Sequence, residues 1–372
     1  MKRLLLLLTF IIFLAFSWSF VEEKFSPTVN KVKEDFHTFI ENGEMKEIVS
    51  AVIETAQTLL GQLGDTVEEQ VEEFEPDLIE KPEITPPTDQ TFSVYNIKIG
   101  DNKQDVEAVL GEPKRISYNE FGLYWYTYHQ NYQNFVQVMY NDSEQVVGLY
   151  TNQDLIASSK NVKLKTPRSI VTESLGEPLT KIQKGFTYYQ LQEDSDYDVY
   201  LLDNSYVTIF YDIHEENTVT SIQMVHEDIE EQKKDFYTAA SVQLKEGFEH
   251  QMFDLTNATR VNHGLSVLVW DEQVRETARK HSIDMAENNY FDHTNLEGQS
   301  PFDRMLEDQI TFSVAGENLA YGQFSSIFAH EGLMNSLGHR ENILKPEFDY
   351  LGVGVAFNDE SHPYYTQNYF TK

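Results

Sequence analysis

The sequence predicts an α+β protein with more than one folded unit, and three observations lead to that prediction. At 372 residues the chain is too long for one ordinary domain, so two domains and a linker are expected. A repeat with an offset of 65 residues occupies the middle of the chain. The last third changes from a helical pattern to two closing strands, at 352–357 and 364–370.

A hydrophobic leader opens the chain. Lys2 and Arg3 precede an uncharged apolar run over residues 4–20, which at roughly 1.5 Å per residue spans about 25 Å. Ala15-Phe16-Ser17 provides a small-x-small cleavage site, which favours a signal peptide over residues 1–20. The alternative is an uncleaved membrane anchor with its basic end in the cytoplasm. Both interpretations predict a protein that is secreted or anchored to the outer face of the cytoplasmic membrane.

Composition excludes several kinds of function. The formal net charge of -33 argues against nucleic acid or an anionic membrane surface as a partner, because such a chain repels phosphates. The absence of cysteine excludes disulfides, thiolate metal sites and a cysteine nucleophile. Residues 21–90 combine acidic runs with several prolines, so they are predicted to be an extended, solvated linker without chemistry of its own.

The repeat predicts one duplicated α+β domain over residues 92–228. The motif Leu-Gly-Glu-Pro at 110–113 recurs at 175–178, and the Ile-x-Ile motif at 97–99 recurs as Val-x-Leu at 162–164. Each copy is interpreted as a short strand, a helix that stops at Leu-Gly-Glu-Pro, and aromatic strands, because glycine suits a helix C-terminus and proline cannot continue the helix. A groove between the copies could bind a ligand, or the repeat could serve only to bury a shared core.

Seven motifs follow one another from residue 248 to the C-terminus. In order they are HSIDM, YFDHT, DRM, AGENLAYG, LMNSLGHRENIL, GVGVAF and YYTQNY. This series resembles the bacterial branch of the CAP superfamily, the cysteine-rich secretory protein-like proteins with an SCP domain, over residues 248–372. The duplicated region resembles the domain that accompanies CAP domains in a subgroup of Gram-positive proteins. The resemblance implies a three-layer α-β-α sandwich with a surface cleft.

The resemblance also implies candidate cleft residues. Eukaryotic members line the cleft with two His and two Glu, of which this chain keeps His293 in YFDHT and Glu317 in AGEN. The second Glu falls on Ser336 and the second His on Tyr364. Bacterial relatives carry a Gly-His-Arg motif instead, so we expect His339 to reach the same cleft.

Two kinds of chemistry are open to these side chains. His293, Glu317 and His339 form a set that can hold a divalent cation, zinc or calcium, with one position open. Their separations of 24 and 22 residues are not those of a helix-borne His-Glu-x-x-His site, so the metal hypothesis depends on the resemblance alone. An acid/base role would need a histidine beside an oriented carboxylate. A nucleophilic serine is disfavoured, because the chain lacks the Gly-x-Ser-x-Gly elbow.

Neighbouring polar residues are expected to be structural. Ser336 is predicted to bond the backbone at its helix end, with a helix stop at Gly338. His281 lies on the inner face of its helix, which favours a buried, hydrogen-bonded imidazole. The remaining members of this group are expected to bond loop carbonyls around the cleft; they are Arg304, Arg340 and Asn318.

The predicted function is an extracytoplasmic binding module whose His/Glu cleft holds a small ligand, a lipid or a divalent cation. Two alternatives stay open: a cleft hydrolase that uses zinc, and a structural or interaction protein of the envelope or spore surface. The last alternative assigns a protein partner to residues 92–228, and the leader adds the prospect of membrane association.

Overall fold

The computed structural model describes residues 79–372, apart from 185–186 and 192–194. The predicted leader and most of the predicted linker lie outside the described residues. The described residues belong to one compact unit that covers 74–372. Within them, every helix is too short or too polar to cross a bilayer.

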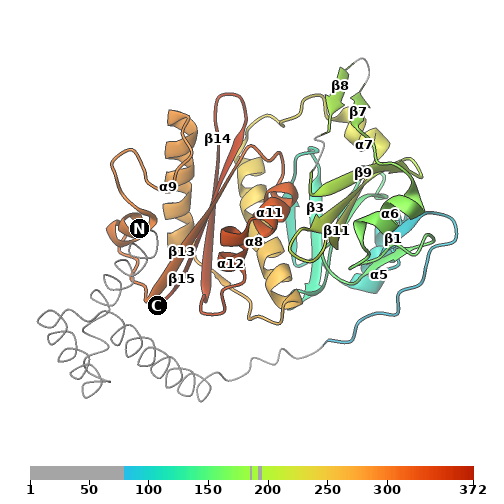
Figure 1. Ribbon diagram of the computed structural model, residues 1–372, viewed down its shortest axis with the longest axis horizontal. Coiled ribbons are helices and arrows are strands. Elements are labelled where there is room, and N and C mark those ends of the chain that lie inside the picture. The colour runs from blue at the N-terminus through green and yellow to red at the C-terminus, as the bar shows by residue number, and fades with distance from the viewer. Residues whose placement is uncertain (1–78, 185–186, 192–194) are drawn as a thin grey trace, which may run out of the picture. The chain divides into compact units, whose positions relative to one another are not determined.

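A seven-stranded antiparallel sheet forms the centre of the first half, which we call the N-terminal lobe (residues 92–232). Its strand order, β2-β3-β4-β5-β11-β10-β9, brings the two copies of the repeat together at β5 and β11, where Tyr150 lies opposite Gln223. The two copies therefore share one sheet (Figure 1). The strands are β2 (Arg115–Tyr118), β3 (Tyr124–Gln130), β4 (Gln133–Tyr140), β5 (Val146–Thr151), β9 (Tyr197–Leu202), β10 (Ser205–Asp212) and β11 (Thr218–His226).

Each copy of the repeat contributes one short helix that ends where the Leu-Gly-Glu-Pro motif predicts. Helix α5 (Lys103–Leu110) stops at Gly111 and α6 (Arg168–Leu175) stops at Gly176, with φ of 76° and 90°. Residues other than glycine rarely adopt such backbone angles. The need for a positive φ at the helix end therefore explains why glycine recurs in the motif. The smaller elements of the lobe are β1 (Phe92–Val94), β6 (Ile156–Ser158), β7 (Lys181–Lys184), β8 (Thr187–Gln190) and α7 (Glu227–Gln232).

A second, four-stranded sheet with five helices forms the C-terminal lobe (residues 242–371). The strand order is β12-β14-β15-β13, so β13 is an edge strand. The two closing strands occur where the sequence predicts them, and the α+β class is confirmed. The elements are α8 (Val242–Asn262), β12 (Val269–Trp270), α9 (Glu272–Asn288), α10 (Pro301–Glu307), β13 (Val314–Tyr321), α11 (Ser326–Asn335), α12 (Leu337–Ile343), β14 (Tyr350–Phe357) and β15 (Pro363–Thr371).

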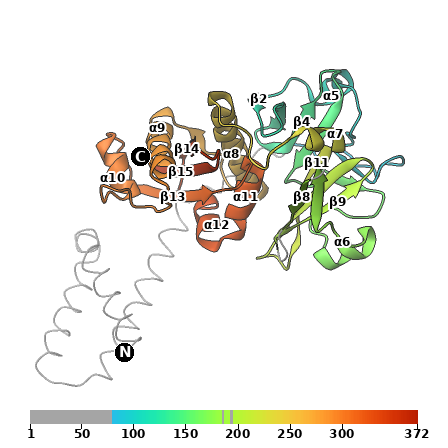
Figure 2. The same cartoon turned by 90° about the horizontal axis from the view of Figure 1, so that it is seen from above.

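Helices cover both faces of this sheet (Figures 1 and 2). Gly352 and Gly354 of β14 face α9, whose backbone lies so close that a Cβ atom on Gly354 would stand 2.1 Å from the amide nitrogen of Arg279. Val353 and Val355 point to the opposite face and share a core with Phe248 of α8. Alternation along one strand thus decides which helix meets which face.

The two lobes pack directly against each other through α8 and α11. Gly247 of α8 lies on β2, where an added Cβ would stand 1.9 Å from the carbonyl oxygen of Tyr118. Arg115 of β2 donates to the buried carboxylate of Asp254 at 2.8 Å, which forms an ion pair between the lobes. The sheet face that meets the C-terminal lobe is apolar as well, since Phe210 of β10 shares a cluster with residues of α8 and α11.

Candidate functional site

Glu317 is the central acidic residue of the candidate cleft. It lies on the edge strand β13 opposite Asn368, which in turn lies opposite Gly352 of β14. Because paired residues of an antiparallel sheet point to the same side, Glu317 faces the α9 side of the sheet. Its side chain is only 2% exposed. A carboxylate so deeply buried needs partners for both oxygens.

Two side chains provide those partners. His293 Nδ1 donates to Glu317 Oε1 at 2.8 Å, and Arg304 Nη2 donates to Oε2 at 2.6 Å. Arg304 also donates through Nη1 to the backbone carbonyls of His293 and Gln299, at 2.8 and 3.1 Å. The expected loop-bonding role of Arg304 is confirmed. Its ion pair with Glu317 was not predicted, although it fixes the carboxylate and the His293 loop together.

The hydrogen bond to Glu317 affects the protonation and the ring orientation of His293. It raises the pKa of the imidazole above its usual 6.5, while partial burial opposes that increase. The bond also holds the proton on Nδ1 and orients the ring, so Nε2 is the nitrogen left for a ligand. The His293 side chain is about half exposed, whereas its partner carboxylate is closed off from water.

His339 belongs to a second hydrogen-bonded pair beside the first. Ser336 Oγ bonds His339 Nδ1 at 2.8 Å. Burial lowers the pKa of His339, and the positive charge of His293 lowers it further. His293 with Glu317 and Ser336 with His339 therefore form two hydrogen-bonded pairs.

Two local predictions at this point were wrong. Gly338 does not stop a helix: α11 ends at Asn335, and Gly338 lies inside α12. Ser336 begins α12 without a side-chain capping bond. Its hydroxyl bonds His339 three residues later instead, because that spacing places two side chains on the same side of a helical turn.

Tyr364 occupies a different kind of position. It is buried with Met285 and Leu319 in a small apolar cluster, and its ring centroid lies 4.4 Å from that of Tyr321. Burial raises the pKa of its hydroxyl to about 12. Tyr364 is therefore a buried, uncharged side chain at the position where the resemblance would place a histidine.

The metal hypothesis does not fit this geometry. Within the described residues, no three His, Asp or Glu side chains are grouped to hold a metal ion. Both Glu317 oxygens accept hydrogen bonds, and the guanidinium of Arg304 stands against one of them. A fixed cation next to the carboxylate disfavours a second cation there. The ligand set His293, Glu317 and His339 for zinc or calcium stays a prediction, and in the described residues Glu317 is ion-paired to His293 and Arg304 instead.

Buried polar atoms without partners surround Glu317. His281 is buried, as predicted, and bonds the Asp292 carbonyl through Nε2 at 2.9 Å. Its Nδ1, the Nε of Arg304 and the side-chain amide of Asn368 have no hydrogen-bond partner among the described residues. Such groups are costly unless water or a ligand meets them. The sequence predicts that Asn368 on the last strand bonds loop carbonyls around the cleft, but its side-chain amide has no such partner within the described residues.

Asn318 and Arg340 differ from each other in outcome. Asn318 Nδ2 donates to the His339 carbonyl at 3.1 Å, which confirms its expected role beside the cleft. Arg340 donates at 3.3 Å to the Met334 carbonyl and at 2.8 Å to Asp212 of the N-terminal lobe, and the second contact was not predicted. The Gly-His-Arg motif therefore serves both the cleft and the contact between lobes.

Comparisons with known proteins agree on the family. Residues 253–369 match the model of the cysteine-rich secretory protein family, and residues 99–236 match that of the CAP-associated N-terminal domain. The uncharacterized membrane protein YlbC of Bacillus subtilis strain 168 is 29% identical over 291 residues, 74% of this chain and 82% of that protein. The uncharacterized protein YkwD of the same organism is 42% identical over 125 residues, 34% of this chain and 48% of that protein.

Solved structures show the same fold. An extracellular protein containing an SCP domain from Bacillus anthracis matches with a TM-score of 0.65 and 27% identity, over 79% of this chain and all of that one. A cysteine-rich secretory protein from Staphylococcus aureus matches with a TM-score of 0.58 and 15% identity, over 74% of this chain and 91% of that one, which shows the fold alone. The chain therefore carries a CAP domain of the cysteine-rich secretory protein family over residues 253–369, preceded by a CAP-associated N-terminal domain over residues 99–236.

Proposed function

We propose that this protein is an extracytoplasmic binding module whose CAP cleft holds the polar headgroup of a single amphiphile. The observation that carries the proposal is the exposed apolar side chains that flank the cleft residues along the chain. Leu296 follows His293 by three residues and is 64% exposed, and Leu337 precedes His339 by two and is 60% exposed. Phe291 is exposed as well and contacts the ring of Tyr321. Exposed apolar groups beside a polar pair suit a ligand with an acyl chain and a headgroup.

The charge of the site limits which kinds of headgroup it can bind. Arg304 and Glu317 neutralise each other, which leaves Nε2 of His293 as the donor for a phosphate or carbonyl oxygen. The net charge of -33 repels an anionic bilayer, so a monomeric zwitterionic or neutral lipid suits the protein better. An extracytoplasmic location is supported by the relative described as a membrane protein and by the similar protein described as extracellular.

Monomeric dihexanoylphosphatidylcholine, titrated by calorimetry below its micellar concentration, tests the proposal. We expect binding that weakens about fivefold in His293→Gln, because losing one charge-assisted hydrogen bond costs about 1 kcal/mol or more. The double variant L296S/L337S should weaken it similarly. Leu201→Ser is the matched control, since Leu201 is an exposed leucine on β9 of the other lobe. Equal affinity in all four proteins would contradict the proposal.

The pH dependence of this binding has a defined sign. The pKa of His293 is raised, so its positive charge persists somewhat above pH 6.5 and is lost as the pH rises through that raised value. Affinity for the phosphate headgroup should therefore fall between mildly acidic and alkaline pH. His293→Gln should bind independently of pH over the same range.

A hydrolase is the second candidate, favoured by one observation. Glu317 anchors Nδ1 of His293 and leaves Nε2 as a base that can activate water. Hydrolysis of p-nitrophenyl acetate or butyrate that disappears in His293→Gln would support this candidate. A rate equal to that of the variant would reject it.

A further inference from the structure

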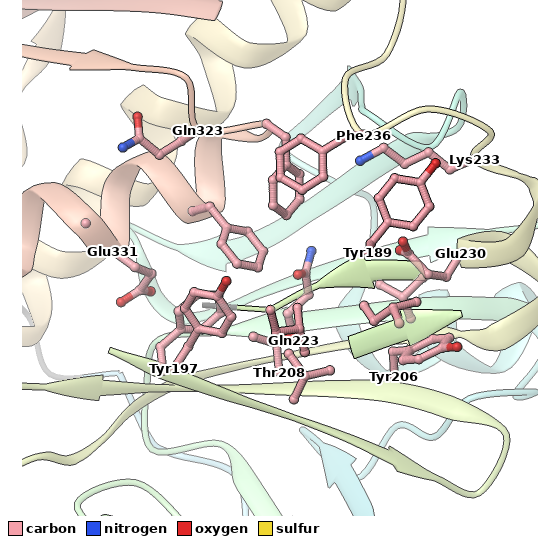
Figure 3. A pocket seen from close by; sticks show the side chains of 18 of the residues that line it. Tyr189, Tyr197, Tyr206, Thr208, Gln223, Glu230, Lys233, Phe236, Gln323 and Glu331 are labelled. Carbon is pink, nitrogen blue, oxygen red and sulfur yellow. The ribbon is translucent and has the colours of Figure 1, made fainter. Parts of the chain in front are cut away.

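A second cavity lies between the two lobes and has a volume of about 460 Å³ (Figure 3). Its floor is the face of the seven-stranded sheet around β9, β10 and β11, and the segment 321–324 with α11 closes it from the C-terminal lobe. This volume lies within the range of small-molecule sites in proteins. Apart from Tyr321, none of its lining residues belongs to the CAP cleft or its flanks.

Aromatic rings form the walls of this interlobe pocket. Tyr197 and Phe210 of the sheet contact Phe328 of α11, with ring centroids 5.1 and 5.0 Å apart. Phe236 contacts Phe324 at 5.0 Å, and Phe236 is 45% exposed. Rings from both lobes therefore present faces and edges to whatever enters the pocket.

Two amides of the pocket have atoms without hydrogen-bond partners. Gln223 of β11 is 3% exposed, and its Nε2 has no partner among the described residues. Figure 3 shows its amide directed from the sheet into the cavity. Gln323 Oε1, from the opposite lobe, is also without a partner within that part of the chain, but Figure 3 shows its amide directed away from the cavity. The buried donor of Gln223 is therefore costly unless a ligand or water meets it in the cavity.

The charged groups of the lining are already engaged. Lys184 pairs with Glu230 at 2.5 Å, and Asp196 accepts from Asn335 at 2.6 Å. Glu331 Oε1 accepts from two hydroxyl groups of the N-terminal lobe, and Lys233 lies over the ring of Phe324. Because Lys184, Asp196 and Glu331 have partners and the ammonium of Lys233 lies against aromatic rings, the pocket suits a ligand without net charge.

The backbone around the pocket offers little to a peptide. Strands β10 and β11 are inner strands, with neighbours on both sides. The outer edge of β9 already accepts a hydrogen bond at Val199 from the amide of Leu179, at 2.7 Å. An extended peptide that adds to a sheet needs a free strand edge. Recognition here therefore falls to side chains.

We infer that the interlobe pocket binds a neutral saccharide. The apolar face of a sugar ring packs on aromatic side chains, and its hydroxyl or acetamide groups both donate and accept hydrogen bonds. Gln223 Nε2 provides a matching donor for an oxygen of one of these groups. The cavity volume accommodates about two sugar rings. This site is separate from the amphiphile cleft proposed above, and either can exist without the other.

Calorimetry of the full chain with triacetylchitotriose, cellotriose and maltotriose tests the inference. We expect at least one trisaccharide to bind with a Kd below about 1 mM. Gln223→Leu should weaken that binding at least tenfold without lowering the melting temperature, because the amide that it removes has no partner to lose. Gln137→Leu is the matched control: Gln137 is buried on β4 of the same sheet, outside the lining, and bonds Thr127. It should lower the melting temperature and keep the Kd.

An aromatic pair provides an independent test of the same site. Phe236→Ala should weaken binding about tenfold, whereas Phe302→Ala should not, although Phe302 on α10 is equally exposed. Three outcomes would overturn the inference: no binding of any trisaccharide, undiminished binding by both pocket variants, or binding of a neutral proline-rich peptide that Gln223→Leu abolishes while the saccharides fail to bind.

Discussion

At the scale of single residues, the Glu317 carboxylate is the group on which the cleft depends. It is buried, and each of its oxygens accepts a hydrogen bond from a cationic or titratable side chain. Breaking a buried ion pair on one side leaves the other charge without compensation. Glu317→Gln should therefore lower the free energy of unfolding by about 3 kcal/mol in urea titrations. Glu307→Gln, at an exposed carboxylate, should change it by less than about 0.5 kcal/mol.

The same variant has a spectroscopic consequence at His293. With Glu317 in place the pKa of His293 is raised, so this pair stabilises the fold below about pH 6.5 and loses that contribution as the pH rises through the raised value. In Glu317→Gln the main cause of the increase disappears. NMR titration of the imidazole C–H resonance of His293 should then give a lower pKa than in the unaltered protein. An unchanged pKa would show that Glu317 is not its cause.

Sequence patterns identify only part of this cluster. His293 and Glu317 stand in motifs, and their pairing follows from the family resemblance. The ion pair of Arg304 with Glu317 and the unpartnered amide of Asn368 depend on how α10 and β15 meet β13, which no spacing along the chain encodes. Hydrogen bonds between distant segments are a property of the tertiary structure.

At the scale of elements, the contact of α9 with β14 decides the packing of the C-terminal sheet. Gly354→Ala would place a Cβ within 2.3 Å of the Ala278 carbonyl carbon, and backbone cannot move away as a side chain can. We expect a loss of about 3 kcal/mol or more of unfolding free energy. Gly338→Ala in α12, where no atom lies within 4 Å of the new methyl, should instead stabilise slightly. Equal stability of the two variants in urea would contradict this account.

Glycine also shows which element boundaries a sequence can reveal. Gly111 and Gly176 stop their helices because each adopts a positive φ and precedes the Glu-Pro of the repeat, a local signal. Gly338 has neither feature, and it lies within a helix. The repeat likewise predicted two similar α+β copies. It did not reveal that β5 and β11 would join them into one sheet, because strand pairing is set by contacts between segments far apart in sequence.

At the scale of the whole molecule, polar contacts connect the lobes as closely as apolar ones. Arg115 with Asp254 and Arg340 with Asp212 are ion pairs across the interface. Glu331 of α11 accepts from Tyr150 Oη at 2.7 Å and Ser221 Oγ at 2.6 Å, both on the sheet of the N-terminal lobe. The sequence predicts two successive domains, but each of these charged residues has its partner in the other one. Residues 74–372 accordingly form one compact unit.

Glu331 makes the stability of this interface depend on pH. Burial raises its pKa to about 7, and the nearby carboxylates of Asp196 and Asp212 raise it further, while the two hydroxyl groups oppose the increase. Between about pH 4.5 and 7 the folded protein therefore holds a proton that the unfolded chain has released, so stability falls as the pH rises.

Glu331→Gln keeps an oxygen for both hydroxyl groups and removes this loss. It should raise the unfolding free energy by about 2 to 3 kcal/mol at pH 7.5 and leave it nearly unchanged at pH 4.5. Glu120, whose pKa burial also raises to about 7, remains in the variant, so the slope with pH should be reduced and not abolished. Urea titrations at both pH values measure the difference, and a variant that is less stable at pH 7.5 would show that the carboxylate is held ionised by the interface.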